Sequence, residues 1–389
     1  MGTVETTNAY IANTYARTPL ALACGKGSLL YDEAGKEYID FGSGIAVNVF
    51  GVADELWQKA VCEQASKLQH CSNYYYTQPQ ARLAQLLCEK SGMQAVFFSN
   101  SGAEANECAI KAARKYSADT YGPGRHRIVT LVNSFHGRTM GALSATGQEA
   151  LHPACFAPYV EGFAHVPPND FGALAAEVEK GGVCAVMLEM IQGEGGVQPL
   201  EGEYVQAVAR LCREKDILFI VDEVQCGNGR TGKYFAYMHH PGVAPDIVST
   251  AKALAGGLPM GATLFGEKTK GILAPGDHGS TYGGNPVCAA AGVSVVSRID
   301  EALLASVTQK GAYLKERLIR TPGVESVAGM GLMLGVKTNK DVKELIAQCR
   351  ERGLIILNAK DKVRLLPALN IPMELLEKGT AILTEVIKK

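Results

Sequence analysis

Two side chains in this sequence stand where a predicted strand ends and could take part in chemistry. Asp222 follows the apolar run 217–221, and Lys252 lies among small and apolar residues in the segment 249–257. A lysine in such surroundings can lose its proton and act as a nucleophile or form a Schiff base. A carboxylate that is partly shielded from water favours a cationic partner, and the protonated nitrogen of a pyridine ring would be one. The pair therefore favours a site that binds a pyridine-ring cofactor.

A third segment, Asn100–Glu104, joins a predicted strand to a predicted helix through small residues. Free backbone N–H groups at the start of such a helix, together with the helix dipole, bind a phosphate well. Each feature alone has a plainer interpretation: Ser101 as a helix cap, Asp222 as a cap of the loop after it, and Lys252 as a solvated surface charge. Because Lys252 comes one βα unit after Asp222, the three features together favour a cofactor that carries a phosphate. Gln225 could then donate to a phenolic oxygen on the same ring.

Other motifs point elsewhere and fail on inspection. Gly227–Gly232 fits the dinucleotide motif G-x-G-x-x-G, but the segment 233–241 is too short and too aromatic for the helix that should follow. An NAD-dependent dehydrogenase is therefore only an alternative from another class. Tyr234 stands where a P-loop requires Ser or Thr, so that motif fails too. No spaced carboxylate accompanies His239–His240, and we expect these to be solvated loop histidines rather than metal ligands.

The elements that must position these residues follow from the alternation of apolar runs and helical stretches between residues 96 and 266. This alternation is typical of an α/β protein with a mostly parallel central sheet. In an open sheet of this kind, ligands bind beyond the carboxyl ends of the strands, where the residues named above are expected. The predicted strands are 96–99, 128–132, 183–189, 217–221, 246–249 and 261–265, and the predicted helices include 103–117 and 203–215.

A chain of 389 residues exceeds the size of one simple core, which predicts a large domain and a smaller one. The two ends of the chain carry short strand-like runs and amphipathic helices such as 345–351 and 374–387. We therefore expect residues 1–63 and 293–389 to form a smaller α+β domain together. Residues 64–292 would form the large, cofactor-binding domain.

The composition is that of a soluble globular protein. A formal net charge of −1 makes nucleic acid and acidic membrane surfaces poor partners. Eleven cysteines are scattered singly without a C-x-x-C pair, as is typical of reduced thiols in the cytoplasm. No apolar stretch approaches the roughly 18 residues that a membrane span needs, and the polar N-terminus lacks the apolar part of a signal peptide. We expect a cytoplasmic protein without a membrane, nucleic-acid or metal partner.

Taken in order along the chain, these motifs resemble those of the class III (ω-) aminotransferases. The resemblance extends over nearly the whole sequence. It implies the aspartate-aminotransferase type of fold (fold type I), pyridoxal 5'-phosphate as cofactor, and a homodimer whose active sites lie at the subunit interface. The blocks that carry it are Asn100–Glu107, Phe135–Thr139, Ile191–Gly196, Asp222–Gly232, Ala251–Lys252 and His278–Pro286.

For the cofactor, the resemblance implies a role for each matching residue. Lys252 would hold it as a Schiff base, Asp222 would pair with its ring nitrogen, and Gln225 would contact its phenolic oxygen. The remaining residues would bind the phosphate or stack on the ring. They are Ser101, Gly102, Ala103 and Phe135, with Thr281 closing the phosphate site from the partner subunit.

For the substrates, the resemblance implies two arginines. Arg138 would clamp a carboxylate, and Glu194 would pair with Arg364 until the second substrate arrives, while Ser280 would reach in from the partner subunit. Ile45 stands where ornithine aminotransferases resemble one another in carrying a tyrosine for the free α-amino group. An apolar residue there favours a blocked amine, and hence N-acetylornithine over ornithine.

Two departures from the family pattern stand out. Gly51–Glu55 stands where a Gly-His-x-His-Pro stretch is common in the family. The route by which substrate enters the site can therefore differ from that of the family. Met190 follows Glu189 where proline is usual. Neither departure touches the cofactor groups.

The activity implied is a ping-pong transamination of N2-acetyl-L-ornithine with 2-oxoglutarate. It gives N-acetyl-L-glutamate 5-semialdehyde and L-glutamate, a step of arginine biosynthesis, and Lys252 would move a proton between substrate and cofactor carbons. Alternatives within the fold are an aminomutase and aminotransferases for ornithine, succinylornithine, succinyl-diaminopimelate or 4-aminobutyrate. Outside it, the alternatives are the dehydrogenase and a cofactor-free scaffold that has lost activity.

Overall fold

The structure, a computed structural model that describes residues 2–389, is built around one seven-stranded sheet. All its strands are parallel except β12, which is antiparallel to both neighbours. In sheet order the strands are β4 (Ala95–Ser99), β12 (Gly261–Phe265), β11 (Ile247–Thr250), β10 (Leu218–Asp222), β7 (Val183–Leu188), β5 (Arg127–Leu131) and β6 (Phe163–Val166). The six predicted strands are confirmed to within one residue at each end. The edge strand β6 was not predicted, because a histidine interrupts its short apolar run and only one of its four residues is fully buried.

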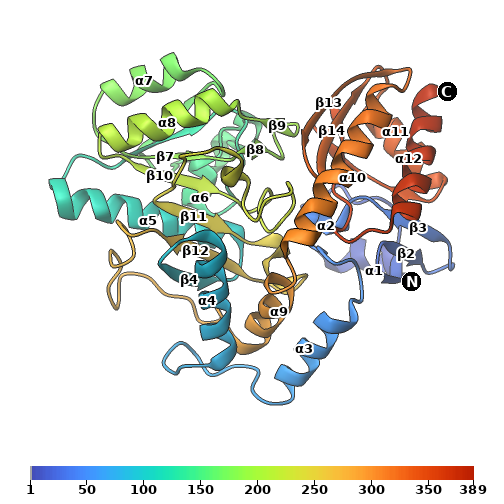
Figure 1. Ribbon diagram of the computed structural model, residues 1–389, viewed down its shortest axis with the longest axis horizontal. Coiled ribbons are helices and arrows are strands. Elements are labelled where there is room, and N and C mark those ends of the chain that lie inside the picture. The colour runs from blue at the N-terminus through green and yellow to red at the C-terminus, as the bar shows by residue number, and fades with distance from the viewer. Residues whose placement is uncertain (1) are drawn as a thin grey trace.

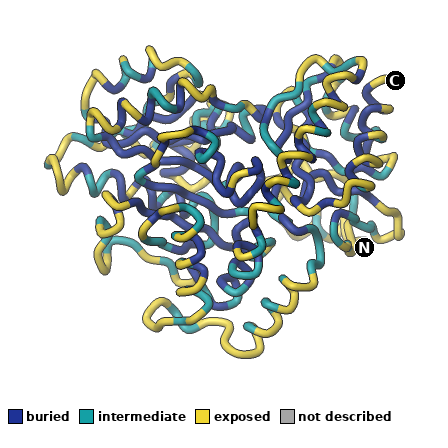
Figure 2. Tube along the Cα trace, viewed as in Figure 1, coloured by how far each residue is buried: buried dark blue, intermediate teal, exposed yellow. Residues whose placement is uncertain are grey.

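Helices cover both faces of this sheet (Figure 1). Ile128 and Ile220 form one core with α5 (Gly102–Tyr121), whereas Val129 and Val221 belong to the core on the opposite face. That second core includes residues of α7 (Phe171–Glu179) and α8 (Gly202–Glu214). The strands are therefore buried on both sides, and the exposed residues lie on the outer faces of the helices (Figure 2). The other elements of this part are α4 (Gln78–Ser91), α6 (Met140–Ala145), η1 (Glu149–Leu151), η2 (Ala154–Phe156), η3 (Ala236–His239), η4 (Lys252–Ala255) and α9 (Pro286–Val296).

Segments from the two ends of the chain meet in one sheet, because β15 (Leu354–Ile355) pairs with β3 (Glu37–Asp40). That sheet continues through β2 (Leu29–Asp32) to β1 (Leu22–Lys26). The domain bounds 1–63, 64–292 and 293–389 stay a prediction. A second four-stranded sheet contains β13 (Val324–Met330), β14 (Met333–Thr338), β17 (Lys362–Leu365) and β16 (Leu357–Ala359). The remaining elements are α1 (Thr3–Tyr10), α2 (Ser43–Ala46), α3 (Glu55–Ala65), β8 (Ile191–Gln192), β9 (Gln198–Pro199), α10 (Glu301–Ile319), α11 (Val342–Glu351) and α12 (Met373–Lys388).

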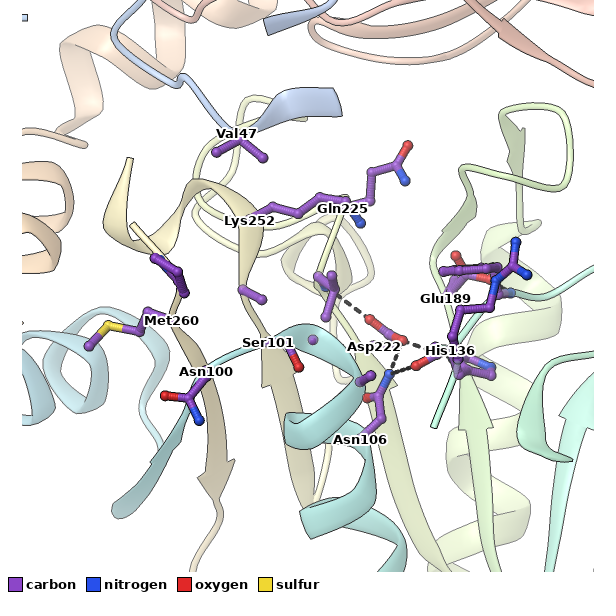
Figure 3. Close-up of a pocket in the computed structure, with 18 of the residues that line it drawn as sticks. Val47, Asn100, Ser101, Asn106, His136, Glu189, Asp222, Gln225, Lys252 and Met260 are labelled. Atoms are coloured by element: carbon purple, nitrogen blue, oxygen red, sulfur yellow. Dashed lines mark hydrogen bonds and ion pairs between the residues drawn. The ribbon is translucent and has the colours of Figure 1, made fainter. Parts of the chain in front are cut away.

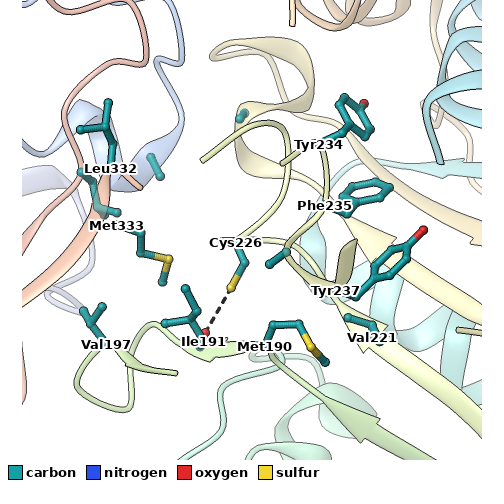
Figure 4. Close-up of a cluster of buried hydrophobic side chains, with 14 of the residues drawn as sticks. Met190, Ile191, Val197, Val221, Cys226, Tyr234, Phe235, Tyr237, Leu332 and Met333 are labelled. Carbon is teal, nitrogen blue, oxygen red and sulfur yellow. Dashed lines mark hydrogen bonds between the residues drawn. The ribbon is translucent and has the colours of Figure 1, made fainter. Parts of the chain in front are cut away.

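A buried apolar cluster joins the loops after β7 and β10 to the C-terminal strands (Figure 4). Cys226 donates a hydrogen bond to the carbonyl of Ile191 at 3.2 Å, and Leu332 and Met333 belong to the same cluster. Met190, which replaces the usual proline, is only 1% exposed within it. The loops that follow the central strands are thus held in place by packing from the other end of the chain.

Candidate active site

A cavity of about 440 Å³ lies at the carboxyl edge of the seven-stranded sheet (Figure 3). Its walls come from the segments that follow β4, β5, β10 and β11, the edge where an open parallel sheet binds its ligands. Eight residues singled out in the sequence line it. They are Ser101, Gly102, Ala103, Phe135, Arg138, Asp222, Gln225 and Lys252.

Lys252 follows β11 and begins the short helix η4. Its φ of 42° lies in the left-handed region, a strained conformation that persists where the surrounding structure enforces it. Burial lowers the pKa of its ammonium group, while the negative charges of Asp222 and Glu194 oppose this effect. A lysine with a lowered pKa can supply a neutral amine that attacks a carbonyl carbon or accepts a proton.

Asp222 ends β10 and is 3% exposed. Its Oδ2 accepts a hydrogen bond from Asn106 at 2.8 Å and lies 2.8 Å from Nδ1 of His136. Its Oδ1 accepts from the backbone N–H of Val224 at 2.9 Å. These contacts fix the carboxylate in one orientation. Sequence reasoning missed Asn106 and His136, although both lie inside blocks that carried the family resemblance.

The predicted phosphate-binding segment is the start of α5. Ser101 caps the helix by accepting from the N–H of Glu104 at 3.2 Å. The first N–H groups of the helix, those of Gly102 and Ala103, precede the regular hydrogen-bonding pattern. A Cβ atom on Gly102 would lie only 2.7 Å from Cγ1 of Val224, so glycine is required for this close packing. The long α5 places its positive dipole end at the cavity.

Phe135 and Arg138 form the wall next to β5. The N–H of Phe135 donates to the buried Glu189 at 2.9 Å, which fixes the backbone that carries the ring. Burial and the neighbouring charge of Asp222 raise the pKa of the Glu189 carboxyl well above its ordinary value. The guanidinium of Arg138 lies 5.6 Å from the centre of the Phe135 ring and faces the cavity as its exposed cation.

Glu194, Arg364 and Gln225 form one hydrogen-bonded group beside the cavity. Arg364 is 3% exposed and forms an ion pair with Glu194. It also donates to the side-chain oxygen of Gln225 at 2.8 Å, and Gln225 donates to Glu194 at 3.2 Å. Burial acts to raise the pKa of Glu194, but Arg364 outweighs it and the pKa is lowered. The predicted pair of Glu194 and Arg364 is therefore present, with Gln225 joined to it.

Ser280 and Thr281 do not line this cavity within one chain. Ser280 accepts a hydrogen bond from Asn100 at 3.0 Å, and Thr281 is exposed beside a small separate pocket that includes His70. Their expected roles depend on a partner subunit and stay a prediction.

The segment proposed to select the substrate lies at one side of the cavity. Val47 lines the cavity, whereas Ile45 is 41% exposed and does not. In Gly51–Glu55, Asp54 caps α3 by accepting from the N–H of Trp57 and pairs with Arg298. The segment that replaces the family's histidine motif is thus tied down structurally and contributes no side chain to the cavity wall.

Two of the rejected motifs take unexpected positions. The Gly227–Gly232 loop is buried against the C-terminal segments, where a Cβ on Gly229 would lie 3.0 Å from Leu369, so it forms no phosphate cradle. The prediction that His239–His240 is solvated is wrong. His240 is 8% exposed, and Nε2 of His239 lies 3.1 Å from the hydroxyl of Thr231, because the aromatic segment folds back onto the glycine loop.

The residues present fit a cofactor with a basic ring nitrogen and a phosphate. The buried carboxylate of Asp222, the tightly packed start of α5 at Gly102, and the amine of Lys252 border one cavity. Nε2 of the buried His136, a residue of the cavity wall, has no hydrogen-bond partner among the described residues. Among residues 2–389, no cluster of three or more His, Cys, Asp or Glu could hold a metal ion. Within the same residues, no helix has the length and apolar character needed to cross a membrane.

Comparisons with known proteins identify the family of this chain. The sequence pattern of the aminotransferase class-III family matches residues 10–387. The acetylornithine aminotransferase of Haemophilus ducreyi is 49% identical over 382 residues, which cover 98% of this chain and 97% of that protein. The ornithine aminotransferase of Toxoplasma gondii superposes with a TM-score of 0.94 at 30% identity, covering 99% of this chain and 94% of the other. For the N-acetylornithine aminotransferase of Stenotrophomonas maltophilia the TM-score is 0.85 at 34% identity, covering 99% and 98%.

Proposed function

The chain belongs to the class III aminotransferases, and we propose that it transfers the terminal amino group of N2-acetyl-L-ornithine to 2-oxoglutarate. The products are N-acetyl-L-glutamate 5-semialdehyde and L-glutamate, which places the reaction in arginine biosynthesis, in the cytoplasm. The observation that carries the proposal is the cavity that brings Lys252 and Asp222 together at the edge of the sheet. The substrate is supported by relatives such as the Haemophilus ducreyi protein, which is named an acetylornithine aminotransferase and is 49% identical.

When it is bound, pyridoxal phosphate supplies an aldehyde carbon that carries the amino group from donor to acceptor and a ring that accepts electrons. Asp222 would stabilise positive charge at the ring nitrogen, and the hydrogen bonds from Asn106 and His136 keep its carboxylate in place. The start of α5 would bind the phosphate, and Phe135, which lines the same cavity, would stack on the ring. The Nζ atom of Lys252 would take a proton from the donor carbon and deliver it to the cofactor, and in the second half-reaction it would move a proton from the cofactor to the acceptor carbon.

Arg138 binds a substrate carboxylate in both halves of the reaction. Its guanidinium can make two parallel hydrogen bonds to a carboxylate, which orients the reacting carbon as well as binding it. Arg364 is held by Glu194 and Gln225 while the acylated donor is bound, because an unpaired cation would be poorly matched to its neutral part. The second carboxylate of 2-oxoglutarate then competes with Glu194 for Arg364.

Ornithine is the second candidate donor, because the fold superposes closely on ornithine aminotransferases. The sequence argument against it is Ile45, which lies beside the cavity of one chain without lining it, since an apolar side chain offers no acceptor for a free α-amino group. Steady-state turnover with 2-oxoglutarate against N-acetylornithine, ornithine, succinylornithine, succinyl-diaminopimelate and 4-aminobutyrate decides between these donors. A higher kcat/KM for any other amine than for N-acetylornithine would overturn the proposed substrate.

The active unit is proposed to be a homodimer. Four tyrosines expose an unusual amount of aromatic surface. They are Tyr74 (92% exposed), Tyr75 (69%), Tyr76 (105%) and Tyr282 (62%). The two tyrosine-bearing segments adjoin, because Asn73 donates to the carbonyl of Ser280 at 3.1 Å. A second copy seated there would cover the aromatic rings and bring Ser280 and Thr281 to its cavity. Light scattering should give twice the chain mass, and a fully active monomer would contradict the proposal.

A further inference from the structure

Four consecutive residues at the edge of the cavity adopt a left-handed turn. The φ angles are 47° at Ser43, 61° at Gly44, 67° at Ile45 and 61° at Ala46. L-residues visit this region singly, because the Cβ atom then crowds the following carbonyl, and β-branched residues such as Ile45 suffer most. A run of four such residues, three of them not glycine, therefore needs a strong local anchor.

The anchor is the buried carboxylate of Asp40, which is 5% exposed. Its Oδ1 accepts from the N–H groups of Gly42 and Ser43, both at 2.8 Å. The carbonyls of the same two residues accept the hydrogen bonds that close the turn. Gly42 accepts from Ile45 and Ala46 at 2.9 and 3.1 Å, and Ser43 accepts from Val47 and Asn48 at 2.8 and 2.9 Å. One carboxylate oxygen thus holds the backbone where the turn begins, because the peptide group between Gly42 and Ser43 offers its N–H to Asp40 and its carbonyl to Ile45 and Ala46.

The turn is coupled to the cavity on its other side. Helix α2, which is this turn, packs against η4, the short helix that begins with Lys252. Val47 follows directly and lines the cavity above Lys252 (Figure 3). The segment then continues to Val49, whose carbonyl accepts from Leu369 at 2.9 Å, so its far end is also fixed.

We propose that Asp40 is a positioning residue for substrate selection, because it holds the left-handed turn that places Val47 at the cavity and Ile45 beside it. Asp40 does not line the cavity and acts through the backbone of Gly42 and Ser43. The consequence for amine selection rests on the proposed function, whereas the anchoring of the turn does not.

The test compares Asp40→Ala, Asp40→Asn and a matched control in the loaded enzyme. Asparagine keeps an Oδ1 acceptor for both N–H groups, and alanine removes it. The control is Asp246→Ala, which also removes a carboxylate that accepts a backbone N–H, that of Phe219 at 2.8 Å, but at the start of β11 and away from the cavity edge. Hydrogen–deuterium exchange of residues 42–48 is measured together with KM and kcat for N-acetylornithine and for ornithine.

Asp40→Ala should speed exchange of residues 42–48 and change the ratio of kcat/KM for the two amines by about 10-fold or more, since misplacing a substrate wall is costly. Asp40→Asn should restore both values, and Asp246→Ala should leave both unchanged. Unchanged exchange in Asp40→Ala, or an Asp40→Asn variant as impaired as alanine, would overturn the proposal. If the alanine variant does not fold, Asp40→Ser is measured in its place with the same expected direction. A wild-type enzyme inactive on N-acetylornithine would overturn the proposed substrate alone, because the exchange measurement needs no turnover.

Discussion

Arg364 and Glu194 form an ion pair beside the cavity although 170 residues separate them in the sequence. Gln225 completes the group by accepting from the same guanidinium at 2.8 Å. Nε of Arg364 is buried without a partner, so the guanidinium still has a hydrogen bond to offer. Arg364 is thus paired with Glu194 but keeps an unused N–H donor. This suits a site that binds a second carboxylate in only one half of the reaction.

Arg364→Ala should impair mainly the half-reaction with 2-oxoglutarate, by about 10- to 100-fold, because a hydrogen bond to a charged group is lost. Single-turnover absorbance of the cofactor separates the two halves. Arg138→Ala is the matched control and should damage both halves. Equal losses in both halves for Arg364→Ala would show that Arg364 is a general binding or structural residue.

Glu194→Ala should chiefly weaken discrimination in the first half-reaction, because Arg364 would face the donor unpaired. We expect KM for N-acetylornithine to rise and glutamate to compete better as a donor. KM values for both donors check this, and an unchanged preference between them would contradict the switch.

Lys252→Ala should abolish turnover while the protein still binds the cofactor, because the other cavity residues are unchanged. In the wild-type enzyme, borohydride reduction followed by mass mapping should find the cofactor attached to Lys252. An adduct on another lysine would refute the assignment.

Asp222→Asn should keep the fold and reduce kcat by about 100-fold or more, because an amide cannot stabilise a protonated ring nitrogen as a carboxylate does. The change also disturbs the contact with His136, whose Nδ1 lies 2.8 Å from the carboxylate. Thermal unfolding measured on the same variant separates a loss of fold from a loss of chemistry. Turnover near that of the wild type would mean that Asp222 serves only as a cap.

Glu223 should make stability depend on pH. Burial raises the pKa of its carboxyl to about 8, although the N–H groups of Ala236 and Tyr237 favour the carboxylate. The folded state then keeps a proton that the unfolded chain loses above its ordinary pKa of about 4.5. The free energy of unfolding should therefore fall as pH rises from about 5 to 8, by at most about 1.4 kcal/mol per pH unit. Thermal midpoints of Glu223→Gln should show a flatter profile in this range, and parallel profiles would disprove it.

The sequence by itself determined the central sheet and the edge at which the site lies. Apolar runs such as 217–221 and 246–249 are local signals, and the rule that ligands bind at the carboxyl ends of parallel strands converts them into a site. Asp222 and Lys252 could therefore be singled out without knowing what surrounds them. The predicted edge is where the cavity lies.

Only the tertiary structure decided which side chains support that site. Asn106 and His136 contact Asp222 from segments that lie 116 and 86 residues away in the sequence. No local sequence pattern predicts such contacts. The left-handed turn at Ser43–Ala46 is contrary to the preference of its residues, and it exists because Asp40 is buried where its Oδ1 meets two N–H groups. In the sequence Asp40 is an ordinary aspartate. Its function depends on burial and on the direction of neighbouring peptide groups, which packing between distant segments sets.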